Sequence, residues 1–263
     1  MANSQQPTAN SQLTPILFSC KRFFARALRA FSKFLPVSVV PSILFRHRDV
    51  PSDTDINHDN WQKYILDNFD REGFEILEVG SRVVTGSRFG QSFRHAHYTG
   101  FDYYEGENVD IAGDAHSLSS YFGDKRFDLI FSSAVFEHLA MPWKVSTEII
   151  KLLKVGGYIF IETHYSFSSH ERPWHFFQFS ENAFNVLFPQ KFGIECVKKG
   201  CSNLLKGWFS GRASRYLRGR IVSGLYCHSE FLGRKVREAE SLSWDNVSTE
   251  EASNSTKYPA PKK

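Results

Sequence analysis

Phe74-Glu75-Ile76-Leu77-Glu78-Val79-Gly80-Ser81 is an apolar run that closes on an acidic residue and a glycine. This pattern is typical of a buried first strand followed by a tight turn. Gly80 lets the backbone pass close to a ligand, and the Glu78 carboxylate can accept hydrogen bonds from an amine or a ribose hydroxyl. The stretch predicts a ligand site at the carboxyl end of a parallel sheet. This prediction depends on whether further strands with polar residues at their ends follow at suitable distances along the chain.

Strands and helices alternate after this stretch. Apolar residues at helical spacing predict a helix over Trp61–Phe69, and a second helix is expected near Pro142–Leu153. The alternation predicts an α/β fold, a Rossmann-like doubly wound and mostly parallel sheet with helices on both faces. Strands are expected at residues 74–79, 97–101, 109–112, 127–132, 158–163, 193–197 and 225–231, with a further helix at 87–94 and a turn at 117–122.

Composition favours one main domain with an extension at each end. The 263 residues are 41% hydrophobic and 23% charged, which is ordinary for a globular protein. We expect a basic extension and linker at 1–60, the main domain at 61–235 and a disordered polar tail at 236–263. The four cysteines form no CxxC pair, so a reducing cytoplasm is the expected compartment.

The N-terminal extension carries seven Lys and Arg residues between Leu13 and Arg48 and no acid. On a helix over 21–35 its Phe and Leu side chains lie opposite its basic ones, and Pro36 ends the helix. Such a helix suits peripheral contact with the inner face of an anionic membrane. Packing of its apolar face on the domain is an equally good interpretation, and an organellar transit peptide is a third.

Each predicted strand of the first half ends in a polar residue. Asp102, after the second strand, is placed to grip ribose hydroxyls, and Asp114, after the third, to accept from an adenine amine. A single Asp at a strand end is more often a turn or cap residue. Acids at three successive strand ends favour a nucleotide-like cofactor. The fourth strand ends at Ser132-Ser133 and is followed by Phe136-Glu137-His138-Leu139.

Together these motifs resemble the class I S-adenosylmethionine-dependent methyltransferases, in particular the UbiE/UbiG-like, methyltransferase type 11 group. The resemblance covers residues 61–197 and implies S-adenosylmethionine as cofactor. It implies that Glu78, Gly80 and Ser81 lie near the methionine part. Asp102 is then expected at the ribose, Asp114 and Ala115 at the adenine, and Ser132 or Ser133 along the cofactor wall.

The turn after the first strand departs from that family. The family carries Glu-x-Gly-x-Gly-x-Gly, whereas Arg82 stands here where glycine is usual. Arg82 is expected to narrow the loop or to reach over the cofactor carboxylate. A catalytically inactive cofactor-binding scaffold is therefore an alternative function. A dinucleotide oxidoreductase is disfavoured because GxGxxG is missing.

A second resemblance concerns residues 169–180, SHERPWHFFQFS. They resemble a Pro-Trp-Asp-Tyr-Trp-Arg-Phe segment of bacterial methyltransferases associated with cell-surface glycan synthesis, with His175 and Gln178 replacing the acid and the arginine. Aromatic rings stack on sugar faces, so Trp174, His175 and Phe177 are the expected acceptor-binding residues. A hydrophobic lid over the cofactor is the alternative. We expect a glycan or small-molecule acceptor.

Methylation of a hydroxyl requires a base of near-neutral pKa, and histidine is the natural candidate. His138 and His164 are the predicted catalytic bases, although a helix-start hydrogen bond explains His138 equally well. Glu137-His138 resembles a divalent-metal pair of some UbiG-like enzymes, but two adjacent residues do not define a site, so no metal is predicted. No nucleic-acid partner is expected, because Ser132-Ser133-Ala134-Val135 stands where base-modifying enzymes often carry Asn-Pro-Pro-Tyr.

Overall fold

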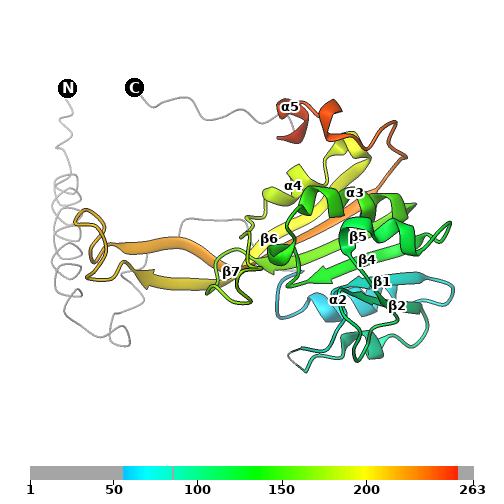
Figure 1. Ribbon diagram of the computed structural model, residues 1–263, viewed down its shortest axis with the longest axis horizontal. Coiled ribbons are helices and arrows are strands. Elements are labelled where there is room, and N and C mark those ends of the chain that lie inside the picture. The colour runs from blue at the N-terminus through cyan, green and yellow to red at the C-terminus, as the bar shows by residue number, and fades with distance from the viewer. Residues whose placement is uncertain (1–55, 85, 254–263) are drawn as a thin grey trace, which may run out of the picture. The chain divides into compact units, whose positions relative to one another are not determined.

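The computed structural model describes residues 56–84 and 86–253, which contain a seven-stranded sheet (Figure 1). The strand order is β3-β2-β1-β4-β5-β7-β6. Neighbours from β3 to β5 are parallel, and β7 is antiparallel to β5. The predicted α/β fold is confirmed. The strands are β1 (Glu75–Val79), β2 (His97–Asp102), β3 (Ile111–Ala112), β4 (Phe127–Ser133), β5 (Leu153–His164), β6 (Ile194–Trp208) and β7 (Ile221–Lys235).

The helices of the described residues are short. α2 (Trp61–Phe69) has the predicted bounds, and α3 (Pro142–Leu152) begins at the predicted proline. The helix expected at 87–94 is only the 3-10 turn η3 (Phe89–Ser92). Two glycines in and beside this segment, Gly86 and Gly90, lower its helix propensity. The remaining helices of the described residues are η4 (Ala115–Tyr121), η5 (Phe136–His138), α4 (Ala183–Leu187), η6 (Gln190–Phe192), η7 (Trp244–Asn246) and α5 (Thr249–Ala252).

Two hydrophobic clusters cover the two faces of the sheet. Side chains alternate along each strand, so Ile159 and Ile161 of β5 face one cluster and Phe160 faces the other. The first cluster packs under α3 and α4, and the second packs under α2. Glu162 follows Phe160 on the α2 face, at the carboxyl end of the strand. The sheet therefore presents a row of polar side chains beyond its core.

The strands β6 and β7 are each 15 residues long, much longer than the predicted 193–197 and 225–231. By its contacts, the described chain divides into residues 56–204 with 225–253 and, separately, the hairpin segment 205–224. The predicted domain at 61–235 is thus interrupted by this segment. The predicted amphipathic helix at 21–35 lies outside the described residues. No helix among those described is long and apolar enough to cross a membrane.

The C-terminal segment corrects the prediction of a tail that is disordered from residue 236. η7 and α5 form at 244–252, and Ser248 and Glu251 make a capping box. The Trp244 ring packs edge-on against Phe192 at 4.9 Å, and its Nε1 donates to the Trp143 carbonyl oxygen at 3.1 Å. The sequence shows few apolar residues here, but three of them, Leu242, Trp244 and Val247, pack against the core cluster. Residues 254–263 lie outside the described part.

Candidate active site

The candidate site lies at the carboxyl ends of the parallel strands, where open α/β sheets bind their ligands. Strand register places Glu78 of β1 beside Phe131 of β4, and Ser133 of β4 beside Glu162 of β5. Asp102 pairs with Ala112, two residues before Asp114. The structure therefore brings the strand-end residues to one edge of the sheet. Their roles stay predictions.

Glu78 is a buried carboxyl group, with 9% of the residue exposed. Tyr98 Oη donates to its Oε2, and Asn108 Nδ2 lies 3.5 Å from the same oxygen. Burial raises the pKa of Glu78 to about 7, against the effect of these two hydrogen bonds. A cationic amine beside this carboxylate would compensate its charge. Tyr98 and Asn108 were not expected from sequence, because their side chains meet Glu78 only through the pairing of β1 with β2.

The turn after β1 has two distinct features. Gly80 has φ +90°, and a Cβ there would lie 2.1 Å from Val135 Cγ2, so the fold itself demands glycine at this position. Ser81 is buried, and its Oγ has no hydrogen-bond partner among the described residues. Buried hydroxyls are normally satisfied, so this unpaired Oγ fits a polar ligand group at the turn.

Asp102 is already engaged by Arg82. The Arg82 backbone N–H and Nε donate to its two carboxylate oxygens at 3.2 Å and 3.3 Å, and Tyr104 N–H donates at 3.1 Å. The Arg82 side chain thus turns to Asp102. A ribose must share or displace this contact.

Asp114 and Ala115 begin η4. Asp114 Oδ1 accepts from the His116 backbone N–H at 2.9 Å and lies 2.6 Å from its Nδ1. Although burial acts in the opposite direction, these hydrogen bonds lower the pKa of Asp114. Both contacts end on Oδ1, and the side chain is 52% exposed, so Oδ2 remains able to accept from an exocyclic amine. Ala115 is buried beside it.

Ser132 does not line the site with its side chain, which corrects the prediction. It is fully buried, and its Oγ donates to the Val79 carbonyl oxygen at 2.8 Å. Ser133, on the opposite face of β4, donates to Glu162 Oε2 at 2.5 Å. The alternation of side chains along the strand therefore selects Ser133 as the serine that faces other polar groups of this edge.

A buried glutamate and a histidine meet at the ends of β4 and β5. Glu137 is fully buried, and His164 Nδ1 lies 2.7 Å from its Oε1. The contact is at ion-pair distance but is not a well-aligned hydrogen bond, and neither atom has a hydrogen-bond partner among the described residues. Thr163 Oγ1 donates to the other oxygen. Burial alone would raise the pKa of Glu137, but the contacts with His164 and Thr163 lower it, so the group is an anion.

His138 fastens the loop that follows β5. Its Nδ1 lies 2.6 Å from the Trp174 carbonyl oxygen, and its Nε2 lies 3.9 Å from Glu137 Oε1. The Phe176 and Phe177 backbone N–H groups donate to the Glu137 carbonyl oxygen. The loop therefore closes over Glu137. Of the two predicted bases, His138 has a structural partner and His164 is held by a carboxylate.

The three expected acceptor residues differ in how far they are exposed and in what they contact. Trp174 is 53% exposed, and its ring lies 6.5 Å from that of Tyr103, an exposed residue after β2 that the sequence did not single out. Phe177 is half-buried and packs on Phe179 at 5.7 Å, so Phe176 is the exposed aromatic at this point of the loop. His175 lies beside His138 and His170, with ring centroids 5.9 Å and 4.7 Å apart.

Two groups of side chains have ligand atoms within 4.8 Å of one another. Glu137, His138 and His170 form one, and His58, Glu162 and His228 form the other. Sequence reasoning considered only Glu137 and His138. His58 lies in a segment predicted to be a linker, and no spacing in the sequence connects it to Glu162 or His228.

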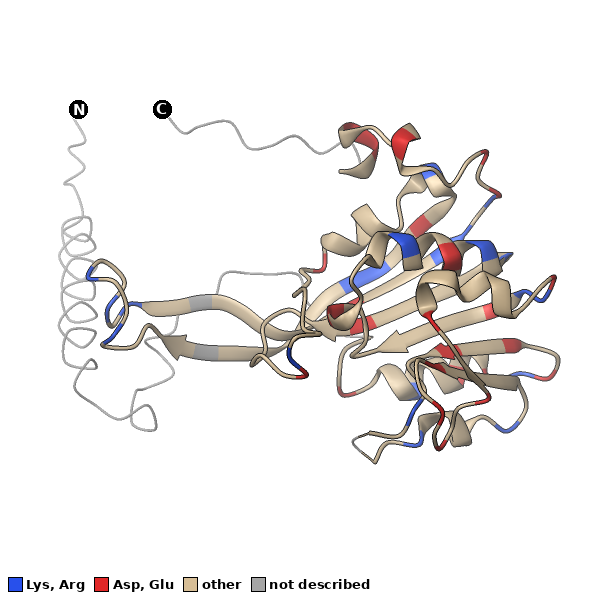
Figure 2. Ribbon diagram, in the orientation of Figure 1, with Lys and Arg blue, Asp and Glu red and all other residues tan. Residues whose placement is uncertain are grey.

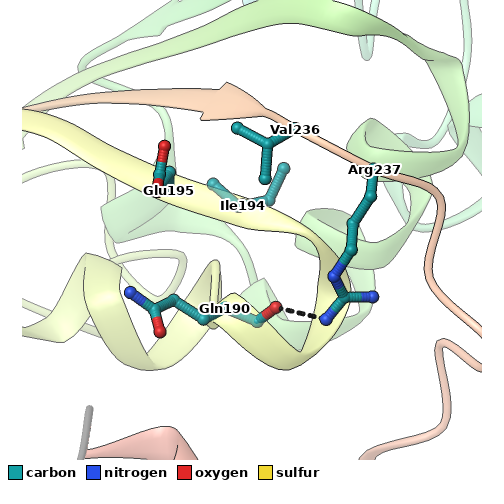
Figure 3. Close-up of a pocket in the computed structure, with 5 residues that line it drawn as sticks. All are labelled: Gln190, Ile194, Glu195, Val236 and Arg237. Carbon is teal, nitrogen blue, oxygen red and sulfur yellow. Dashed lines mark hydrogen bonds between the residues drawn. The ribbon is translucent and has the colours of Figure 1, made fainter.

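A surface hollow of about 200 Å³ lies at the opposite edge of the sheet (Figure 3). Gln190, Ile194, Glu195, Val236 and Arg237 line it, and Arg237 Nη2 donates to the Gln190 carbonyl oxygen at 3.0 Å. It lies at the start of β6 and the end of β7, away from every residue of the candidate site. We assign it no role.

Comparisons with known proteins agree with the fold. Residues 84–161 match the family model of the methyltransferase domain, a segment that begins after Glu78 and Gly80. A SAM-dependent methyltransferase from Archaeoglobus fulgidus is 17% identical with a TM-score of 0.51, over 67% of this chain and 92% of that chain. This likeness shows the fold.

Two further solved structures are similar at TM-scores below 0.5. The YcgJ protein from Bacillus subtilis is 16% identical with a TM-score of 0.47, over 70% of this chain and 100% of that chain. The plantazolicin methyltransferase BamL, solved with a triazolic desmethylPZN analog and SAH, is 16% identical with a TM-score of 0.46, over 68% and 83%. No curated protein matches the sequence.

Proposed function

We propose, from the class I methyltransferase fold and the methyltransferase-domain segment at 84–161, that this chain is an S-adenosylmethionine-dependent methyltransferase that acts on a hydroxyl group of a glycan or small metabolite. One observation carries the choice of a hydroxyl acceptor. It is the buried Glu137–His164 pair at the ligand edge of the sheet.

The strand-end residues fit the cofactor. The Glu78 carboxylate suits its amine, and the unpaired Ser81 hydroxyl lies at the same turn. We assign Asp102, at the end of β2, to the ribose, and Asp114 Oδ2 to the adenine amine. When bound, the cofactor supplies an electrophilic methyl group, and the protein has mainly to position donor and acceptor.

His164 is the proposed general base. The Glu137 carboxylate beside Nδ1 favours the tautomer that carries its proton there, which leaves the Nε2 lone pair for the acceptor hydroxyl. The ring stacks on Phe167 at 4.5 Å, so its orientation is held. His164 accepts the hydroxyl proton as the oxygen takes the methyl group. His138 positions the loop through the Trp174 carbonyl oxygen.

Exposed aromatic rings support a sugar acceptor. Trp174, Phe176 and Tyr103 come from the loops after β5 and β2, and their rings lie within contact range of one another, 5.6 Å for Trp174–Phe176 and 6.5 Å for Tyr103–Trp174. Sugars present apolar faces that stack on such rings. We therefore place the glycan beside Trp174, with His175 at the edge of the same loop.

Peripheral contact with an anionic membrane is a further part of the proposal. It is proposed for residues 21–35 on their sequence, and the hairpin segment 205–224 adds support. Figure 2 shows basic residues at the turn of this hairpin, where all of them are arginines, and no acid stands between Glu195 and Glu230. Exposed apolar side chains accompany the charges, including Phe209 and Tyr216. Arginines beside exposed aromatics suit an anionic lipid surface better than water alone.

Calorimetric titration of the full chain tests the cofactor. We expect S-adenosylmethionine and S-adenosylhomocysteine to bind and NAD not to bind. Methyl transfer is then measured with nucleotide sugars and lipid-linked glycans as acceptors. His164→Gln should lower kcat about 10²- to 10⁴-fold with unchanged cofactor affinity. His97→Gln, an exposed histidine on β2, is the matched control.

Cofactor binding without transfer to any acceptor would favour the scaffold alternative. Failure of both S-adenosyl ligands to bind would overturn the proposed function. Equal kcat in His164→Gln and the wild type would remove His164 as the base.

A further inference from the structure

Two histidine rings stack over one buried carboxylate at the edge of the candidate site. His58, just before α2, and His228 of β7 have ring centroids 3.9 Å apart at an interplanar angle of 10°. His58 Nδ1 lies 2.6 Å from Glu162 Oε1, and His228 Nε2 lies 3.7 Å from the same oxygen. Three segments that are distant in the sequence thus bring one ligand atom each, from His58, Glu162 and His228, close together.

Glu162 also has a second carboxyl group directly opposite. Glu230 of β7 is its cross-strand partner, and the two residues are 3% and 1% exposed. Like charges at directly opposite positions destabilise a sheet, and the cost rises with burial. Glu230 Oε2 is buried and has no hydrogen-bond partner within the described chain. A cation held at Glu162 would offset the charge of this buried pair.

The ligand set selects the kind of cation. Two imidazoles and one carboxylate are the protein ligands of open zinc sites, whereas magnesium and calcium prefer sites built from oxygen. Metal–ligand distances of about 2.0–2.2 Å place ligand atoms about 3.0–3.5 Å apart. The atoms here lie within 4.8 Å of one another. For the set to surround an ion, the widest separation would have to shrink by up to about 1.3–1.8 Å, and His58 Nδ1 and Glu162 Oε1, now 2.6 Å apart, would have to separate slightly. Side-chain rotation covers both changes.

Neighbouring residues hold the ligands in place, as outer-shell groups do at metal sites. Ser133 Oγ donates to Glu162 Oε2, and Ser202 Oγ accepts from the His58 backbone N–H at 3.2 Å. The Asn203 side-chain amide lies 3.1 Å from His228 Nδ1. With its oxygen turned to the ring, Asn203 accepts the Nδ1 proton and leaves the Nε2 lone pair for the ion.

We propose that His58, Glu162 and His228 bind one divalent transition-metal ion of the zinc type. The other group, Glu137, His138 and His170, is less available. Both Glu137 oxygens face Thr163 or His164, and His138 Nδ1 faces the Trp174 carbonyl oxygen. The His228 and His164 rings have centroids 5.7 Å apart, so the ion lies beside the proposed base. Binding of the ion itself does not rest on the proposed function.

The test is titration of the chelator-treated full chain with Co²⁺, followed by displacement with Zn²⁺. We expect one equivalent of Co²⁺ with a visible absorption band of low-symmetry coordination, which Zn²⁺ abolishes. Glu162→Gln and His228→Gln should each weaken Co²⁺ binding at least tenfold. His170→Gln and His97→Gln should bind as the wild type does.

Unchanged Co²⁺ binding in Glu162→Gln and His228→Gln would overturn the proposal, and so would loss in His170→Gln alone. Circular dichroism and the melting temperature of the metal-free variants show whether each folds. If Glu162→Gln does not fold, His58→Gln takes its place, since His58 lies at the surface. Cofactor titration of the same samples is independent, so failure of the metal site and failure of the proposed function are distinguishable.

Discussion

At the residue scale, Arg82 changes what Asp102 is able to do. The Asp102 carboxylate accepts from Arg82 and Tyr104, so its usefulness to a ribose depends on whether these contacts are shared or exchanged. The sequence predicted an unusual residue at this turn but not its partner. The two residues are 20 positions apart and meet only because β1 and β2 are neighbours.

Asp102→Ala should weaken binding of S-adenosylmethionine by about 1–3 kcal/mol, because it deletes the ribose acceptor. Calorimetry measures the change, and Glu105→Ala, an exposed acid three residues on, is the matched control. Affinity equal to that of the wild type would show that the ribose lies elsewhere.

Glu78 predicts a pH dependence of cofactor binding. Burial holds its pKa at about 7, so the group loses its charge as the pH falls below that value. A cationic amine needs the carboxylate, so affinity should rise with pH up to about 7 and fall again only where the amine itself loses its proton, at about pH 8. The decrease below 7 should approach about tenfold per pH unit. Titrations between pH 5.5 and 8.5 measure it, and Glu78→Gln should bind more weakly without this slope.

Glu78 also makes the stability of the fold depend on pH, but in the opposite direction from cofactor affinity. Its pKa in the folded state lies above the ordinary value of 4.5, so its contribution to stability is present below pH 4.5 and is lost as the pH rises through 7. Denaturant unfolding at pH 5 and pH 8 should therefore differ less for Glu78→Gln than for the wild type. Glu230, with a similarly raised pKa, contributes equally to both proteins. An equal difference in both would contradict the assignment.

At the scale of elements, the segment after β7 belongs to the folded core. Trp244→Ala should lower the free energy of unfolding by about 2 kcal/mol, because it removes the contact with Phe192 and the hydrogen bond to the Trp143 carbonyl oxygen. Urea unfolding measures the loss, with exposed Glu240→Ala as the control. Equal stability of the two variants would mean that η7 adds nothing to the core.

Elements were predictable where periodicity was long and regular. α2 was found from the spacing of its apolar residues, and β1 and β4 from short segments that are mostly apolar. The lengths of β6 and β7 were not predicted, because a two-stranded hairpin carries no continuous apolar signal. The segment of η3 forms only a 3-10 turn, because the glycines at 86 and 90 lower its helix propensity and its two apolar residues do not compensate for this loss.

At the scale of the whole molecule, the proposed membrane contact depends on two basic segments. Replacing the four arginines of 205–224 with serine should weaken the free energy of binding to anionic vesicles by about 1 kcal/mol per arginine at low salt. Sedimentation with the vesicles measures this binding. Deleting residues 1–45 should weaken it further and leave a folded core, since the described residues from Ile56 onward form two hydrophobic clusters of their own. The arginines are Arg212, Arg215, Arg218 and Arg220.

The control carries serine at four exposed basic positions of the other unit: Lys63, Arg71, Arg94 and Arg234. It should sediment as the wild type does, and neutral vesicles should bind none of the proteins. If the hairpin variant sediments fully with anionic vesicles, the hairpin is not a contact. Binding of RNA in place of vesicles would contradict the membrane proposal.

The sequence by itself determined the α/β order of elements and the acids at the ends of β1, β2 and the segment after β3. Each is a local pattern, since apolar spacing encodes which side chains are buried and where a strand stops. Tertiary structure alone decided the partners: Arg82 on Asp102, Glu137 on His164, and His58 with His228 over Glu162. His58 and Glu162 are 104 positions apart. Their contact depends on strand order and on the face that each side chain takes, which no local spacing contains.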